Sequence, residues 1–407
     1  MKNVIKKWTE TSLVIRIFIG LLIGVVLALA LPQASFISVL GSVFVGALKA
    51  IAPVLVAVLV ISSIANAKKG IGSRFRTVII LYMVSTLLAA VVAVVGSMVF
   101  PVQMVLADTT TGNPPQSIGE VFMNLLTGMV SNPIAALSGA NYLGILFWAI
   151  ILGLGLKKIA KQQTIDMISD FSDVVSLVVG WVIQFAPFGI LGLVFEAVSE
   201  NGLSIFTTYG KLVVLLVSCM LIVALVIDPF IAFLFLKKNP YPLVFKCLKK
   251  SGLTAFFTRS SAANIPVNMK LCEELGLDKD FYSVSIPLGA TINMDGAAIT
   301  ITVMTLATAF TLGINVDIPT ALILCVVAAL GACGTSGVAG GSLLLIPMAC
   351  SLFGISNDIA MQVVAVGFII SVIQDSVETA LNSSGDVMFA ATAEFYDRRK
   401  HGEEVKF

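Results

Sequence analysis

Long apolar runs along the chain predict membrane-spanning helices. Up to residue 236, six nearly uninterrupted runs are mostly long enough to cross about 30 Å of hydrocarbon as α-helices. They occupy residues 13–31, 36–65, 77–100, 142–156, 174–198 and 212–236. Three later apolar stretches, around 281–310, 319–353 and 358–393, are interrupted by polar and small residues. The pattern predicts an all-α integral membrane protein with about eight transmembrane helices.

The second half of the chain repeats one arrangement. An apolar arm leads to a polar tip at 258–264, and an apolar helix that is broken at 293–296 follows. Another apolar arm leads to a Gly-rich tip at 334–342, and a helix that carries Asp375, Asn382 and Asp386 follows. Paired, interrupted apolar segments point to a transporter site built from inverted repeats. We therefore predict two re-entrant helical hairpins, with two ordinary loops between packed helices as the alternative.

Composition agrees with a membrane protein. Hydrophobic residues make up 58% of the 407 residues and charged residues only 12%, about half the charged share of a typical soluble domain. This disfavours a large soluble protein, and the net charge of +2 gives no reason to expect a nucleic-acid partner. The six cysteines lie in or beside apolar segments without metal-ligand spacing, so we interpret them as small hydrophobic residues.

Basic residues gather in alternate loops. They occur before the first apolar run, between the second and third, after the fourth, after the sixth and at the end of the chain. By the positive-inside rule this alternation places both termini in the cytoplasm. The N-terminus has the charge pattern of a signal peptide, but we interpret 13–31 as an uncleaved first span because many spans follow. We expect a multi-pass protein of the cell inner membrane, in contact with the lipid bilayer.

The last apolar helix carries polar residues on one face. Asp375, Thr379, Asn382 and Asp386 follow one another at intervals of four, three and four residues, which places them on one side of an α-helix. Each charge at the bilayer centre costs roughly 2.5–3.5 kcal/mol, so these carboxylates and that of Glu378 need partners or water. A functional site is the favoured interpretation. A solvated helix end is the alternative, most of all for Asp386.

The broken helix before it offers oxygen ligands. Asn293 and Gly296 weaken the helical hydrogen bonding and free backbone carbonyls, and Asp295 adds a negative charge. Carbonyls with a carboxylate suit an alkali cation. The first tip supplies backbone N–H groups and Ser hydroxyls, which suit a carboxylate. An amino acid needs such donors for its carboxylate and an aspartate for its ammonium.

Enzyme chemistry has little support. Gly334-Thr335-Ser336-Gly337 matches the nucleophile motif of intramembrane serine proteases, but the single histidine, His401, lies in the charged tail and leaves the serine without a base. The intramembrane aspartyl protease motif and the phosphate-binding loop are also absent. We predict that the protein is not an enzyme. An ion channel is the remaining rival, but two tips of different chemistry favour coupled transport.

These motifs together resemble the dicarboxylate/amino acid:cation symporters, the glutamate transporter family. The resemblance rests on the tip at 258–264 with Pro266, the break at 293–296, the Gly-Thr second tip and the helix with Asp375 and Asp386. It covers the C-terminal half strongly and the earlier spans by number and topology. The family implies co-transported sodium, a homotrimer and a transport domain that moves against a static scaffold.

The resemblance also implies a role for particular residues. Asp375 would hold the substrate ammonium and Asn382 the substrate carboxylate. The other implied substrate-binding positions are Thr379, Ser261 and the backbone at Arg259 and Val338. One sodium site would use Asp386 with the carbonyls of Gly289, Asn293 and Asn382. A second would lie between Thr291 and Thr335, and a third would use Tyr82, Ser85, Thr86, Asn293 and Asp295.

The resemblance gives a division of the chain as well. Residues 1–236 would form the first six spans, mainly scaffold with part of the transport domain. Residues 237–407 would form the transport core, with two re-entrant hairpins and two broken helices.

Two departures from the family pattern bear on the substrate. Members that carry acidic substrates have an Arg where this chain has Glu378, and a Thr where it has Ala297. Without that Arg, a second substrate carboxylate would lack a partner and would meet a like charge. Glu378 would instead accept a hydrogen bond from a substrate hydroxyl. We therefore expect sodium-coupled uptake of small neutral amino acids, with serine and threonine the best fit, and another small carboxylate or amino acid as the alternative.

Overall fold

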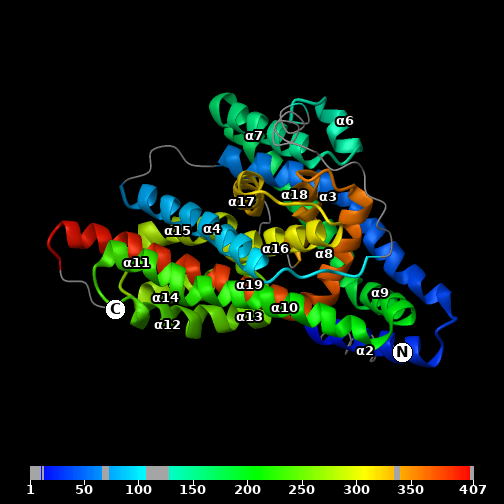
Figure 1. Ribbon diagram of the computed structural model, residues 1–407. Coiled ribbons are helices and arrows are strands. Elements are labelled where there is room, and N and C mark those ends of the chain that lie inside the picture. The colour runs from blue at the N-terminus through cyan, green and yellow to red at the C-terminus, as the bar shows by residue number, and fades with distance from the viewer. Residues whose placement is uncertain are drawn as a thin grey trace.

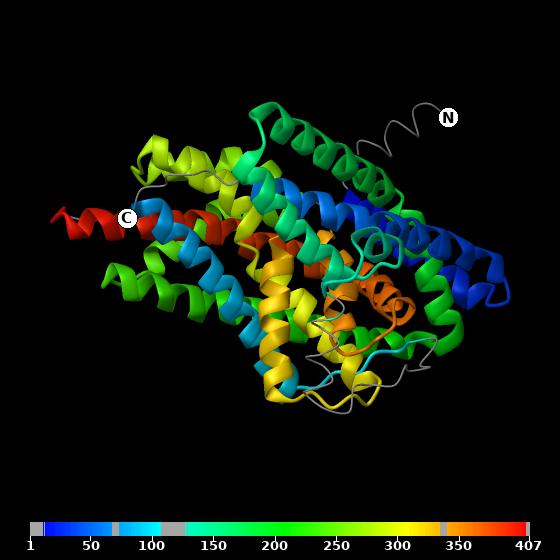
Figure 2. The same cartoon turned by 90° about the horizontal axis from the view of Figure 1, so that it is seen from above.

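The computed structural model describes residues 11, 13–66, 73–106, 127, 129–333 and 340–403. All regular secondary structure in these ranges is helical, and the prediction of an all-α fold is confirmed. In Figures 1 and 2 the long helix α19 (Asn357–Lys400) crosses the middle of the molecule, and other helices, such as α17 (Ile318–Ala332), lie at steep angles to it.

Most helices in the first half of the chain overlap the predicted apolar runs, and α6 (Pro133–Ser138) lies outside them. The others are α2 (Leu13–Ala30), α3 (Ser38–Asn66), α4 (Ser73–Val99), α7 (Tyr142–Ile159), α8 (Gln162–Gln184), α9 (Ala186–Asn201), α10 (Ile205–Ile222) and α11 (Asp228–Leu236). Short 3-10 turns, η1 (Ser35–Ile37) and η2 (Gly202–Ser204), precede α3 and α10, and a π-helical turn, η3 (Val223–Ile227), joins α10 to α11.

The second half is more broken, as its interrupted apolar pattern predicts. Its helices are α12 (Tyr241–Cys247), α13 (Leu253–Thr258), α14 (Ser261–Glu274), α15 (Lys279–Ile292), α16 (Asp295–Thr311), α17 (Ile318–Ala332), α18 (Ile346–Ser351) and α19. A π turn, η4 (Leu248–Gly252), joins α12 to α13, and a 3-10 turn, η5 (Gly341–Leu345), precedes α18. The predicted tip at 258–264 begins where α13 ends, and the predicted break at 293–296 separates α15 from α16.

Five helical segments among the described residues are long and apolar enough to cross a membrane. The bent pair α8 and α9 would make a sixth span. The multi-pass membrane character is therefore confirmed, whereas the number of eight spans and the re-entrant hairpins stay predictions.

One predicted span departs from a straight helix. The apolar run 174–198 lies partly in α8 and partly in α9, which meet at Phe185 with a bend of 51°. Pro187 follows the bend and has no N–H to offer the carbonyl of Ile183. Its ring also crowds that carbonyl, so the helix cannot continue unchanged. The prediction of one continuous helix over 174–198 was wrong for this reason.

The helices gather into two packed groups. In one, α2 and α3 pack on α9, and α7 and α8 pack on α3. Gly20 of α2 lies so close to α9 that a Cβ on it would sit 2.1 Å from the Pro187 carbonyl oxygen. Such small residues let helix backbones approach closely in a membrane. In the other group, α4 packs on α16, α17 and α19, while α10 to α15 also contact α19.

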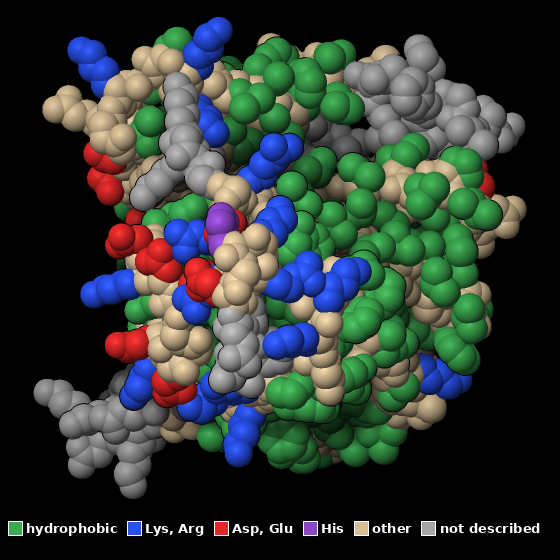
Figure 3. All heavy atoms as spheres, turned by 90° about the vertical axis from the view of Figure 1, so that its left-hand side faces the viewer, with side chains coloured by type: hydrophobic (Ala, Val, Ile, Leu, Met, Phe, Trp, Pro, Cys, Tyr) green, Lys and Arg blue, Asp and Glu red, His purple; other side chains and the backbone are tan. Residues whose placement is uncertain are grey.

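Charged side chains gather at one end of the bundle. Figure 3 shows that Lys, Arg, Asp, Glu and the single His cluster on the end formed by the loops around α12, α15 and the last turns of α19. Arg74 Nη1 lies 3.0 Å from Asp278 Oδ2 there, and Arg398 pairs with the fully buried Glu394. Both Glu394 oxygens accept the backbone N–H of Asp278 at 3.0 Å, which ties α19 to the start of α15.

Candidate substrate and cation site

The polar residues of α19 lie on one face and inside the protein. The helix is unbroken from Asn357 to Lys400, so the intervals between Asp375 and Asp386 place their side chains as the sequence predicts. Asp375, Glu378, Thr379 and Asn382 are 3–6% exposed, and Asp386 is fully buried. A solvated helix end is therefore excluded for Asp386.

Asp375 is paired with the side chain of Arg259. The guanidinium Nε lies 2.6 Å from Asp375 Oδ2, and both side chains are almost fully buried. The backbone N–H of Gly340 donates to the other oxygen, Oδ1, at 3.2 Å. Arg259 ends α13 in the left-handed conformation, with φ of 52°, and this turns the chain at the first tip.

The family resemblance implied a role only for the backbone of Arg259, and the role of its side chain was missed. Arg259 and Asp375 stand 116 positions apart, and no spacing relates them. The available signal was the arginine itself, because an ionisable residue in an apolar segment needs a partner. Ser261, the first residue of α14, is 3% exposed and lies at the same tip. Val338 and Thr335 lie outside the described residues.

Glu378 lies among hydrogen-bond donors. Its Oε2 accepts from Thr300 Oγ1 at 2.7 Å, from Ser342 Oγ at 2.9 Å and from Gln374 Nε2. Its Oε1 accepts no hydrogen bond from any part of the chain that the structure describes. These donors hold the carboxylate in one orientation while leaving one oxygen available.

Asn382 joins α19 to the break between α15 and α16. Its Oδ1 accepts from the backbone N–H of Gly296 at 2.8 Å, and its own carbonyl accepts from Asn293 Nδ2 at 3.1 Å. A Cβ on Gly296 would sit 2.8 Å from Glu378 Cα. Glycine is thus required for α16 to approach α19 at this point. Thr379 donates its hydroxyl to the Asp375 carbonyl at 2.7 Å.

Asp386 carries a buried oxygen without a partner. Its Oδ1 accepts from Asn293 Nδ2 at 3.1 Å, whereas Oδ2 and Asn293 Oδ1 have no partner among the described residues. A Cβ on Gly289 would sit 2.8 Å from Asp386 Oδ1, so α15 can reach this carboxylate only with a glycine. The structure therefore brings Gly289, Asn293, Asn382 and Asp386 together, as the first predicted sodium site requires.

Several residues of the third predicted sodium site also lie together. Asp295 is fully buried, and its oxygens accept from Ser85 Oγ and Thr86 Oγ1, each at 2.8 Å. The Tyr82 hydroxyl instead donates to the Asp386 carbonyl at 3.0 Å. Tyr82 thus contacts the backbone at Asp386 and not the Asp295 carboxylate. For the second predicted site, the Thr291 hydroxyl donates to the Leu288 carbonyl at 2.7 Å.

One acidic residue of this cluster was missed in the sequence. Asp228, at the start of α11, is 2% exposed and lies 2.7 Å from Ser85 Oγ through its Oδ1. The signal was present, because Asp228 is the one acid in the apolar run 212–236. A charge in such a run indicates a functional position by default.

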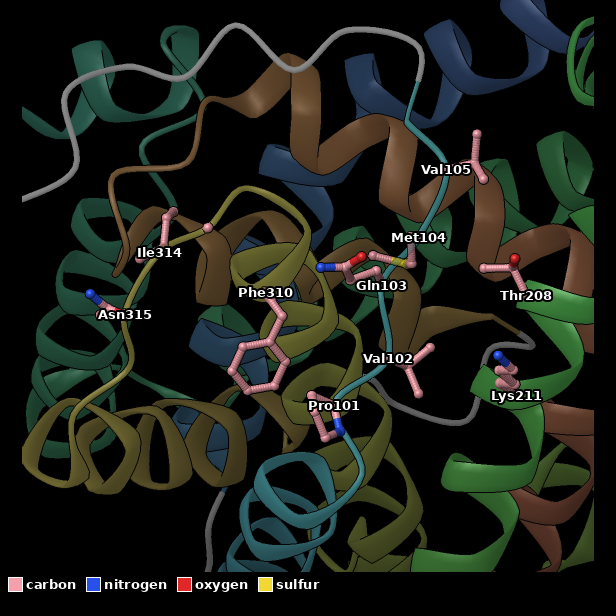
Figure 4. Close-up of a pocket in the computed structure, with 11 residues that line it drawn as sticks. Pro101, Val102, Gln103, Met104, Val105, Thr208, Lys211, Phe310, Ile314 and Asn315 are labelled. Carbon is pink, nitrogen blue, oxygen red and sulfur yellow. The ribbon is translucent and has the colours of Figure 1, made fainter.

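A separate pocket holds none of the predicted residues. Figure 4 shows it lined by Pro101, Gln103 and their neighbours after α4, by Thr208 and Lys211 of α10, and by Phe310 and Asn315 near the α16–α17 connection. This surface hollow lacks the buried carboxylates that mark the cluster on α19.

Comparison with known proteins agrees with this geometry. The family model described as the sodium:dicarboxylate symporter family matches residues 13–394. The chain belongs to this family. It is 59% identical to a serine/threonine transporter of Bifidobacterium adolescentis, over 100% of this chain and 94% of the relative. It is 59% identical to one of Streptococcus agalactiae and 56% to one of Streptococcus thermophilus, each over 97% of this chain and 98% of the relative. Members of this symporter family are transporters and not enzymes.

The Arg259–Asp375 pair leads to a stability prediction. Arg259→Gln leaves a buried carboxylate without its cation and should destabilise the substrate-free protein by about 3 kcal/mol or more. Adding Asp375→Asn should recover much of the loss, since no uncompensated charge remains. Thermal unfolding in detergent measures both variants. Arg74→Gln is the comparison variant, because its pair with Asp278 is partly exposed, at 35% and 38% for the two side chains, and should contribute only about 1 kcal/mol. Equal effects of Arg259→Gln and Arg74→Gln would contradict the assignment.

Proposed function

We propose that the protein is a sodium-coupled symporter that carries small neutral amino acids, with serine and threonine as its main substrates, into the cell. The carrying observation is the fully buried Asp386, whose Oδ2 has no partner in the described part of the chain. A buried charge requires a counter-charge or strong donors. The surrounding carbonyl, amide and hydroxyl oxygens are the hard ligands that an alkali cation accepts. The names of the serine/threonine transporters above support the substrate.

The amino acid would bind along the α19 face. Its ammonium would replace the Arg259 guanidinium on Asp375, since both are cations that donate hydrogen bonds to a carboxylate. Its carboxylate would lie near Asn382 and the Ser261 end of α14, where backbone N–H groups at the helix start favour an anion. Exchange of one cation for another keeps Asp375 paired throughout, which avoids an isolated buried charge.

Glu378 would select the side chain. Its Oε1 is available to accept a hydrogen bond from the hydroxyl of serine or threonine, while Thr300, Ser342 and Gln374 hold Oε2. A side-chain carboxylate at the same place would meet a like charge. Discrimination against acidic substrates would therefore come from repulsion as well as from a lost partner.

An acidic amino acid is the second candidate substrate. The family description includes dicarboxylates, and Arg259 Nη1 has no partner among the described residues. Once displaced from Asp375, this guanidinium would be available to a second substrate carboxylate. The nearby charge of Glu378 disfavours this candidate.

The assembly and orientation follow from the family resemblance and the charges. We propose a homotrimer in the cell inner membrane, with both termini in the cytoplasm. Residues 1–236 would supply mainly the scaffold, and residues 237–407 the transport core. The basic side chains near α12 and the end of α19 gather on one end of the bundle (Figure 3), and by the positive-inside rule that end faces the cytoplasm.

Uptake into proteoliposomes tests the coupling. Labelled serine should accumulate with an inward sodium gradient and should stop accumulating when the gradient is collapsed, because the buried carboxylates need the cation. Replacement of sodium by choline should have the same effect. Equal uptake of labelled serine in sodium-free buffer, driven by an inward proton gradient alone, would contradict the proposal.

Exchange of charge at Glu378 tests the substrate assignment. Glu378→Arg should weaken serine binding about tenfold or more through loss of the acceptor and should allow aspartate to compete, since a guanidinium binds a carboxylate bidentately. Ala297→Thr in the same background should add a hydroxyl and strengthen aspartate competition. Glu200→Arg, exposed on α9, is the control and should leave both substrates unaffected. If aspartate already competes well in the unmodified protein, Glu378 does not select against it.

A further inference from the structure

Asp228 lies in the protein interior, next to a π turn and a proline that interrupt its helix. Pro229 has no N–H, so the Leu225 carbonyl cannot form its usual helical bond. The Tyr241 hydroxyl donates to that carbonyl instead, at 3.0 Å. The preceding turn widens to a π turn, in which the Asp228 N–H donates to the Val223 carbonyl. Such π turns are frequent at functional sites. The result is a carboxylate that is 2% exposed in an otherwise apolar segment.

A single hydroxyl stands between two buried carboxylates. Ser85 Oγ lies 2.7 Å from Asp228 Oδ1 and 2.8 Å from Asp295 Oδ2. A serine hydroxyl has one hydrogen and can donate to only one of them. No Lys or Arg within the described ranges forms an ion pair with either aspartate. Two buried carboxylates in this arrangement require either a proton or a cation to offset their charge.

A buried amide lies beside Asp295. Asn293 is fully buried, and its Oδ1 has no hydrogen-bond partner among the described residues. A Cβ built on Gly385 would sit 2.7 Å from Asn293 Nδ2 and 3.9 Å from Asp295 Oδ2. The Asn293 amide and the Asp295 carboxylate therefore flank one point of α19. Asp228, Ser384 and Gly385 also line one small cavity, so Asp228 and Gly385 face a common space.

We propose that Asp228 is a ligand of the cation held by Ser85, Thr86 and Asp295, and that one alkali cation binds between the two aspartates. The proposal rests on the sodium coupling proposed above and adds a second carboxylate, from α11, to that site. The cation would supply the positive charge that the shared hydroxyl cannot. Asn293 Oδ1 would complete the set of oxygen ligands. With Asp228 included, the ligands come from α4, α11 and the α15–α16 break. Cation binding would therefore hold these three elements in contact.

Sodium binding in the absence of serine tests this role directly. Radioactive sodium binding to the purified protein in detergent gives the sodium concentration at half saturation. Asp228→Asn keeps the shape of the side chain and removes its charge, so this concentration should rise about tenfold or more, as expected for a lost charged contact. Asp173→Asn makes the same change on an exposed position of α8 and should have no effect.

The outcomes separate this inference from the proposed function. If the unmodified protein binds no sodium, the proposed coupling itself fails. If it binds sodium and Asp228→Asn binds it equally well, only the role of Asp228 is overturned. Unchanged sodium binding together with an altered pH dependence of uptake would show that Asp228 carries a proton, which also overturns the proposal.

A second variant covers a folding failure of Asp228→Asn. Asp228→Glu keeps the charge but moves the carboxylate farther from the helix. It should bind sodium and should change the ratio of lithium to sodium affinity, because the ligand position changes. An unchanged ratio in a folded Asp228→Glu protein would contradict a direct contact between residue 228 and the cation.

Discussion

Burial of carboxylates away from water is the constraint on which the core of this protein depends. The long helix α19 carries Asp375, Glu378 and Asp386 into an interior that is lined elsewhere by apolar side chains. Each of these charges must meet a cation or several donors, since an isolated buried ion is far too costly. The three carboxylates are accommodated differently. Asp375 pairs with a guanidinium, and Glu378 accepts hydrogen bonds from three donors. Asp386 has one oxygen without a partner among the described residues. This difference is the basis of the different roles proposed for them.

The irregular backbone around α19 follows from the same need. The break between α15 and α16 releases backbone groups of residues 293–296, and the Asn382 amide oxygen accepts the N–H of Gly296. Glycines at 289 and 296 let these segments approach Asp386 and Glu378 more closely than any side chain would allow. Polar backbone at membrane depth is tolerated because it is buried in protein and serves the site. The breaks are therefore part of how the site is built.

The sequence alone predicted what depends on local periodicity. Helical spacing placed Asp375 and Asp386 on one face, and the Asn293–Gly296 break was visible from residue types. Contacts between residues far apart in the sequence could not be predicted. No local pattern relates Arg259 to Asp375, and none relates Glu378 to Thr300 or Ser342. The bend at Phe185 was missed because the apolar run continues through Pro187. In the sequence, Asp228 was recognisable only as an isolated acidic residue in an apolar run. Its partner Ser85 could not be predicted, because it lies 143 positions away.

Sodium and the amino acid should stabilise each other's binding, because both would bind among the buried carboxylates around α19. Titration of the purified protein with serine by calorimetry, at a series of sodium concentrations, measures that coupling most directly. Serine affinity should rise steeply with sodium concentration. Serine should raise sodium affinity by the same factor, as linkage requires. A serine affinity that is independent of sodium concentration would contradict this coupling.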